Sequence, residues 1–153
     1  MSARVGIGYD AHRFAAGRSL MLGGVEIPHH VGLEGHSDAD VLTHAVIDAL
    51  LGAAGLGDIG TLFPPDEERW RDAHSLDLLT VTLGNLHGRV ENVDATLICE
   101  APRIGPHRAE MERTLGDALS APVNVKATTN EGMGSIGEGE GIACFAVALL
   151  ELD

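Results

Sequence analysis

The chain has 153 residues, and its apolar fraction of 44% fits a single folded domain over residues 1–153 with its own core. Its 10 basic and 23 acidic side chains give a formal charge of −13, which repels nucleic-acid phosphates and anionic lipid and so excludes nucleic acid and membrane as partners. No apolar run is long enough to span a bilayer and no signal-peptide pattern is visible, so we expect a cytoplasmic protein with reduced cysteines at Cys99 and Cys144.

Hydrophobic spacing predicts alternating strands and helices. The expected elements are, in chain order, a strand at 4–9, a broken hairpin at 20–27, a helix from Ser37 as its N-cap to a stop at 55–57, a loop at 58–66, a weaker helix at 73–86, a strand at 93–99, a helix at 105–119, and strands at 123–128 and 142–150. This order indicates one α/β or α+β domain in which helices cover one sheet.

A group of possible metal ligands follows the first predicted strand. Asp10 and His12 are two residues apart, and on an extended segment they point to the same face. His44 lies on the polar stripe of the next helix, where Asp48 is one turn further on and within reach to orient its imidazole. Two histidines and a carboxylate are a common ligand set for a zinc ion with an open coordination position. The same pattern also fits surface polar residues and an ordinary solvated helix face.

Two further segments carry polar groups suited to phosphate. His36 directly precedes the predicted helix start, where free backbone N–H groups favour anions, although it also fits a plain loop histidine. Thr128 and Thr129 lie at the end of a predicted strand and Glu131 follows them, an arrangement that suits a phosphate with Mg²⁺. The same residues also fit an ordinary strand end followed by a solvated acid. No protein nucleophile stands out, which favours a transfer whose nucleophile is part of the substrate.

Several segments together resemble the 2-C-methyl-D-erythritol 2,4-cyclodiphosphate synthase family. They are RVGIGYDAHRF, LGGVEIPHHVGLEGHSDADVLTHAVIDALLGAAGLGDIGTLFPP, NVDATLICEAPRIGPH and NVKATTNEGMGSIGEGEGIACFAVALL. The resemblance implies conversion of 4-diphosphocytidyl-2-C-methyl-D-erythritol 2-phosphate into the cyclic diphosphate with release of CMP, in the non-mevalonate isoprenoid pathway. It also implies a mixed sheet with helices on one face, and a homotrimer with active sites between subunits.

The resemblance assigns roles to individual residues. It implies a Zn²⁺ on Asp10, His12 and His44, a Mg²⁺ or Mn²⁺ on Glu131, and transition-state stabilisation by His36 and Thr129. Contacts to a nucleotide diphosphate substrate are implied for these site residues other than His44. They are also implied for Ser37, Asp58, Ile59, Gly60, Phe63, Pro64, Pro65, Asp66, Glu67, Ala101, Pro102, Arg103, Ile104, Gly105, Thr128 and Asn130.

Two other functions fit the same ligands. A metal-dependent phosphohydrolase would activate water and release inorganic phosphate without a cyclic product. A non-catalytic trimeric scaffold would lose stability without its metal and would turn over no substrate.

Overall fold

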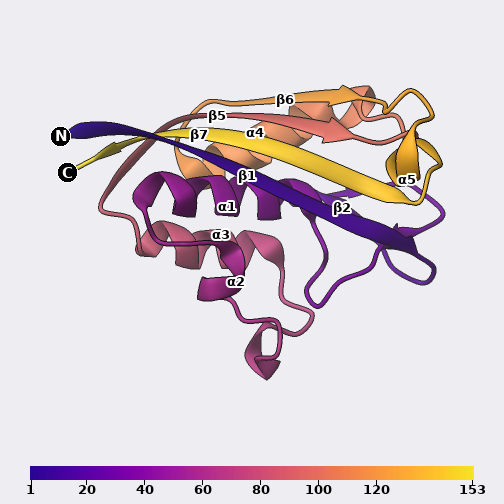
Figure 1. Cartoon of the computed structure of the whole chain (residues 1–153), viewed down its shortest axis with the longest axis horizontal. Helices are drawn as coiled ribbons and strands as arrows, with labels where there is room; N and C mark the ends of the chain where they lie inside the picture. The colour runs from indigo at the N-terminus through magenta and orange to yellow at the C-terminus, as the bar shows by residue number, and fades with distance from the viewer.

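The computed structural model describes residues 1–153 and builds them around one mixed five-stranded sheet in the order β4-β1-β7-β5-β6 (Figure 1). Its strands are β1 (Ser2–Ala15), β4 (Gly32–Leu33), β5 (Gly88–Ile98), β6 (Val123–Thr128) and β7 (Gly141–Leu152). Only β5 and β6 are parallel; β1 runs antiparallel to β4 and β7, and β7 antiparallel to β5. The hairpin β2 (Leu20–Leu22) and β3 (Val25–Ile27) forms a separate small sheet, as the glycine-broken sequence predicts.

The helices cover one face of this sheet. The covering helices are α1 (Val41–Ala54), α3 (Ser75–Gly84) and α4 (Arg108–Leu119). The single-turn helix α2 (Ile59–Leu62) contacts α1, and the single-turn helix α5 (Gly134–Gly137) lies at the end of the sheet beside β7 (Figure 1). There are 3-10 turns at Glu68–Trp70 and Gly105–His107. Helix α1 packs on β1 and β7, while α3 packs on α1 (Figure 1). None of these helices combines the length and the apolar character needed to cross a bilayer. The mixed sheet with helices on one face confirms the expected α+β class.

Two glycines let α1 lie directly on β1. A Cβ added to Gly6 would sit 2.0 Å from the carbonyl oxygen of Ala49, and one added to Gly8 would sit 2.0 Å from that of Ala45. Any residue larger than glycine would overlap α1 at these two positions. The backbone of α1 can therefore contact β1 only because the inward-facing residues there lack a side chain. Asp10 and His12 continue the same alternating face of β1. The close approach therefore brings α1 to the polar end of this face.

Helix α1 starts later than the sequence predicts. Its N-cap is Asp40 and not Ser37, and the Asp40 carboxylate is fully buried. It accepts hydrogen bonds from the backbone N–H groups of Gly23 (2.8 Å), Gly24 (2.7 Å) and Thr43 (2.9 Å), and from the Thr43 hydroxyl (2.8 Å). One carboxylate thus caps the helix and ties it to the β2–β3 turn. The predicted helix end is confirmed, because Gly55 closes α1 in the left-handed conformation with φ 71°.

Other differences concern where elements begin and end. Strand β1 runs six residues beyond Tyr9 to Ala15, so Asp10 and His12 lie within the strand and not at its end. The predicted loop at 58–66 contains the single-turn helix α2, and the glycine-rich segment contains α5. The last strand is buried on one face only, because Phe145, Val147 and Leu149 alternate with buried neighbours.

Candidate active site

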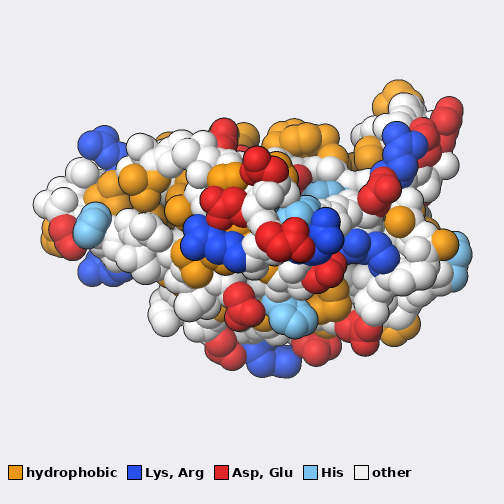
Figure 2. All heavy atoms as spheres, turned by 90° about the horizontal axis from the view of Figure 1, so that it is seen from below, with side chains coloured by type: hydrophobic (Ala, Val, Ile, Leu, Met, Phe, Trp, Pro, Cys, Tyr) orange, Lys and Arg blue, Asp and Glu red, His pale blue; other side chains and the backbone are white.

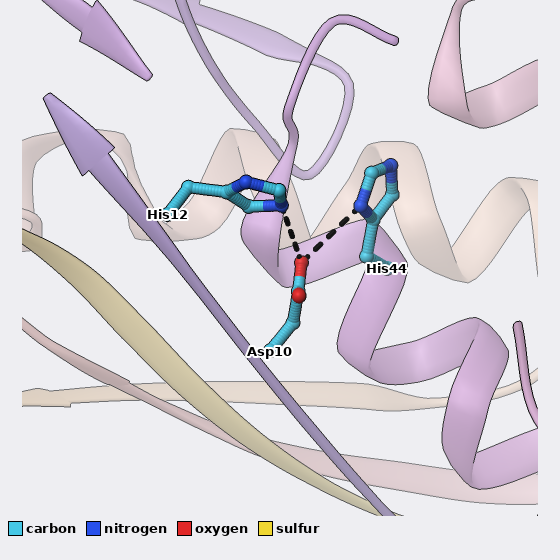
Figure 3. A group of neighbouring side chains, drawn as sticks. All are labelled: Asp10, His12 and His44. Atoms are coloured by element: carbon cyan, nitrogen blue, oxygen red, sulfur yellow. Dashed lines mark ion pairs between the residues drawn. The ribbon is translucent and has the colours of Figure 1, made fainter. Parts of the chain in front are cut away.

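Asp10, His12 and His44 meet at the point where α1 crosses β1 (Figure 3). Oδ2 of Asp10 lies 2.8 Å from Nε2 of His12 and 3.2 Å from Nδ1 of His44. The three ligand atoms all lie within 4.8 Å of one another. Tetrahedral zinc bonds of about 2.0–2.1 Å require ligand atoms about 3.3 Å apart, which is close to these separations. The group could therefore hold a metal ion.

The polar atoms of this group support the same conclusion. Asp10 Oδ2 and His12 Nε2 are buried, yet neither has a hydrogen-bond partner of acceptable geometry. Buried polar atoms without partners are costly, and a cation placed between them would satisfy both. Burial raises the pKa of Asp10, but the neighbouring imidazoles of His12 and His44 outweigh it and leave that pKa below its ordinary value. Asp10 therefore faces the site as a carboxylate anion, the form in which it could bind a metal ion.

The outer ring nitrogens of both histidines are fixed by the protein. Nδ1 of His12 lies 2.8 Å from the carbonyl oxygen of Glu34, and Nε2 of His44 lies 2.8 Å from the hydroxyl of Ser75. The expected role of Asp48 is wrong, because its carboxylate instead accepts from the backbone N–H of Ile59 at 3.2 Å. Asp48 thereby joins α1 to α2, which stands beside the site.

A cavity of about 240 Å³ opens beside Asp10, His12 and His44, which are called the metal group below. It brings together residues from six separate segments of the chain, namely His12, His36, Ser37, His44, Ile59, Gly60, Phe63, Pro65, Trp70 and Leu78. His36 reaches the next segment through Nε2, which lies 3.3 Å from the carbonyl oxygen of Glu67. Pro64, Asp66 and Glu67 belong to the same segment without lining the cavity, and Asp58 begins α2 beside it.

Asp58 is the N-cap of α2, and local hydrogen bonds favour its anionic form. Its Oδ1 accepts from the backbone N–H of Thr61 at 2.9 Å and from the Thr61 hydroxyl at 2.7 Å. These hydrogen bonds hold the pKa of Asp58 below its ordinary value.

The remaining predicted site residues gather around a second cavity of about 450 Å³ where β5 and β6 end. It is lined by Cys99, Glu100, Pro102, Arg103, Ile104, Gly105, Pro106, Ala127, Thr128 and Thr129. Ala101 lies in the same loop, and Asn130 and Glu131 follow Thr129. No residue lines both this cavity and the one beside the metal group. Within one chain the predicted site residues therefore form two separate halves.

Hydrogen bonds fix the conformation of the half-site at the ends of β5 and β6. The Glu100 carboxylate accepts from the backbone N–H of Asn130 at 2.8 Å, and the Thr129 hydroxyl accepts from that of Glu131 at 3.2 Å. Glu131 itself is exposed and has φ 53°. The turn that carries the Glu131 carboxylate is therefore held by the side chains of Glu100 and Thr129.

Four residues near the two cavities were not predicted from the sequence, namely Glu100, Trp70, Leu78 and Ser75. Trp70 and Leu78 line the metal-side cavity, and the ring of Trp70 meets that of Phe63 edge to face with centroids 4.9 Å apart. Their spacing carries no local signal of a site. Glu100 directly follows the strand 93–99, and a carboxylate at that position was the one available hint.

Known proteins match the whole chain. The model of the YgbB family matches residues 3–151. A 2-C-methyl-D-erythritol 2,4-cyclodiphosphate synthase of Gloeobacter violaceus is 54% identical over 154 residues, covering 97% of this chain and 94% of the relative. A solved synthase of that name in a CDP-bound form is 36% identical with a TM-score of 0.86, covering 97% of this chain and 100% of its own.

A larger protein contains the same fold. The bifunctional IspDF of Campylobacter jejuni is 36% identical with a TM-score of 0.94 over 99% of this chain, which spans 43% of that longer protein.

Proposed function

This chain belongs to the YgbB family, and we propose that its two half-sites together catalyse the formation of 2-C-methyl-D-erythritol 2,4-cyclodiphosphate. The enzyme converts 4-diphosphocytidyl-2-C-methyl-D-erythritol 2-phosphate into this cyclic product with release of CMP, in the non-mevalonate route to isoprenoid precursors. The observation that carries the proposal is the Asp10–His12–His44 group, which opens on a cavity lined by His36 and α2.

Two metal ions fit the residues of the site. Asp10, His12 and His44 would hold Zn²⁺, because they offer two imidazoles and a carboxylate at suitable separations. Glu131 would hold Mg²⁺ or Mn²⁺, ions that typically use one or two protein carboxylates together with substrate phosphates. When bound, such ions polarise phosphate oxygens and neutralise their charge.

The protein's own residues bind and orient the substrate. The 2-phosphate of the substrate is the nucleophile toward the β-phosphorus of its diphosphate, and CMP is the leaving group. His36 and Thr129 would donate to phosphate oxygens on which charge builds up. Asp58, Ile59 and Gly60 would hold the erythritol hydroxyls, and the segment 63–67 would cover them. No protein nucleophile is needed, since positioning and charge stabilisation supply most of the catalysis in phosphoryl transfer.

We assign the cavity at the ends of β5 and β6 to the cytidine nucleotide. Its volume of about 450 Å³ lies in the range typical of small-molecule sites, and it gathers the loop from Ala101 to Gly105 with Thr128 and Thr129. A solved relative with this fold was obtained in a CDP-bound form, which supports the assignment.

A homotrimer with active sites between subunits would unite the two halves. Beyond the separation of the cavities, the open face of the sheet supports assembly. On it Val5 is 69% exposed, Ile7 65%, Tyr9 53% and Phe145 43%. Contiguous exposed apolar surface of this kind marks protein–protein contacts, and closed rings require contacts of unlike surfaces.

Cys99 and Cys144 support the cytoplasm as the proposed compartment. Both are free and buried. Burial, with a smaller contribution from Glu100, raises the pKa of Cys99 to about 11, and burial also raises the pKa of Cys144. Both groups therefore stay protonated thiols at neutral pH, as suits a reducing environment.

His36→Ala should lower kcat by about 10²–10³-fold, the typical cost of one lost donor to a developing oxyanion. Zinc content should stay at the wild-type level, because His36 is not among the three metal ligands. Steady-state CMP release with zinc measured by atomic emission checks both. Unchanged kcat would remove His36 from the reaction, and loss of zinc would make it a structural support of the metal group.

Mixing two inactive variants tests the composite site. His44→Ala damages the metal half, and Glu131→Gln damages the other half. If each active site joins halves of two neighbouring subunits, randomly mixed trimers contain intact sites at about one quarter of positions, and CMP release should recover to that level. Each variant mixed with itself is the control and should stay inactive. No recovery in demonstrably mixed trimers would place both halves of the site in one subunit and contradict the proposed assembly.

A further inference from the structure

The ring nitrogen of His44 that points away from Asp10 is linked by hydrogen bonds to two further side chains, Ser75 and Asp38. No sequence motif marks these two residues. Nδ1 of His44 faces Asp10, and its Nε2 lies 2.8 Å from the hydroxyl oxygen of Ser75. Ser75, at the first position of α3, is fully buried, and its hydroxyl donates to Oδ1 of Asp38. The three residues thus form a continuous path from the metal group to a carboxylate in the loop before α1.

The donors around Asp38 fix the direction of every hydrogen bond in this path. Besides the Ser75 hydroxyl, the Asp38 carboxylate accepts from the backbone N–H of Asp40 at 3.1 Å and from that of Ser75 at 3.0 Å. All its partners are donors, so Asp38 acts as an acceptor only. The single hydroxyl proton of Ser75 is therefore committed to Asp38, and Ser75 Oγ can only accept from His44.

That direction selects one form of the His44 ring. If Ser75 accepts, the proton of the neutral imidazole sits on Nε2, and the lone pair of Nδ1 is free toward Asp10 and His12. Ser37 Oγ, 3.1 Å from the same Nε2, already accepts from the backbone N–H of Ala39 at 3.3 Å and is a weaker second partner. Hydrogen-bond partners on the outer nitrogen are the usual means of setting both tautomer and ring orientation in a metal-binding histidine.

We propose that Ser75 and Asp38 are positioning residues that hold His44 as the Nε2–H tautomer, with Nδ1 presented to the metal. This inference rests on the proposed zinc site, since it concerns how one of its ligands is prepared. It also explains why α3 is anchored at this place: Asp38 binds both the backbone N–H and the hydroxyl of its first residue. The contact that orients the ligand is also the contact that fixes the start of the helix.

The test is zinc affinity, measured on the full-length protein by competition with a chelator. Ser75→Ala should bind zinc about 10–100-fold more weakly than wild type, the usual cost of losing such a partner. Asp38→Asn should weaken binding in the same direction, and the double variant should lose little more than Ser75→Ala alone, because both changes break one path. Additive losses would mean that the two residues act separately and would overturn the path.

Thr82→Val is the matched control. Thr82 is also a fully buried hydroxyl of α3, but it donates to the carbonyl oxygen of Leu78 at 2.9 Å and lies outside the site. Its loss should leave zinc affinity unchanged. Ser75→Ala that binds zinc as tightly as wild type, while His44→Ala binds none, would refute the role of Ser75 and leave the zinc site standing. Full zinc binding by His44→Ala would instead refute the site itself.

Nitrogen NMR of the zinc-loaded wild-type protein tests the tautomer without any variant. Histidine side-chain correlations should show His44 with a proton on Nε2 that exchanges slowly, and a metal-bound Nδ1. A proton on Nδ1, or zinc bound through Nε2, would overturn the proposal even if Ser75→Ala fails to fold.

Discussion

His44→Ala should leave the protein without stoichiometric zinc and slow the release of CMP by at least about 10³-fold. The imidazole is one of three ligands, and Asp10 and His12 alone provide only two. Lewis-acid stabilisation of phosphoryl transfer supplies several kcal/mol, and each 1.36 kcal/mol corresponds to a tenfold change in rate. Metal analysis of the purified variant, together with its steady-state rate, measures both effects.

His87→Ala is the control for this experiment. His87 is an exposed histidine outside the metal group, so its removal should change neither zinc content nor rate. A His44→Ala variant that keeps a full equivalent of zinc would show that the metal is held elsewhere.

Much of the fold follows from local sequence patterns. The apolar stripe of residues 41–53, the glycine stop at 55–57 and the strand 123–128 are all found where spacing predicts them. Strand β1 was predicted too short because its inward positions alternate Gly6, Gly8, Asp10 and His12, none of which reads as apolar. They face a helix backbone and a metal group instead of a hydrophobic core, and periodicity does not reveal such neighbours.

The start of α1 shows a different limit. Ser37 followed by Asp40 has the spacing of a capping box, so local rules place the helix start at Ser37. In the fold, Asp40 is the cap because the backbone N–H groups of Gly23 and Gly24 also need its carboxylate. Those donors lie sixteen or seventeen residues earlier in the chain, and a tertiary contact therefore decides between two locally acceptable caps.

The metal group could be inferred from residues alone, but its support could not. A strand pair of Asp10 and His12 followed by a helix histidine restricts the geometry enough to predict that they meet. The partner of His44 was assigned to Asp48, one turn away, whereas the structure places Ser75 there, 31 residues further along the chain. The residues alone indicate Thr128, Thr129 and Glu131 as a place for phosphate and Mg²⁺, whereas the role of the nucleotide loop 101–105 came from family resemblance only. No local pattern relates these segments to the metal group, because they line a separate cavity within one chain.

Charge gives a physical reason for the two proposed metal ions. The chain carries a formal charge of −13, and acidic side chains are spread over the face in Figure 2 with basic ones among them. The substrate brings three phosphates to this acidic protein. Arg103 is the one arginine or lysine that lines either cavity described above. Bound cations are the local charges that can offset this repulsion, so activity should depend wholly on them.

Removal of the metals is accordingly the most direct test of the proposed reaction. Its effect is read by ³¹P NMR of the diphosphocytidyl-methylerythritol phosphate incubated with the protein, Zn²⁺ and Mg²⁺. We expect coupled signals of a cyclic diphosphate with equimolar CMP, abolished by EDTA and restored when both ions are added back. Inorganic phosphate without a cyclic product would identify a hydrolase. An unchanged spectrum with zinc bound would leave only a metal-binding scaffold, and either result would contradict a cyclodiphosphate-forming enzyme.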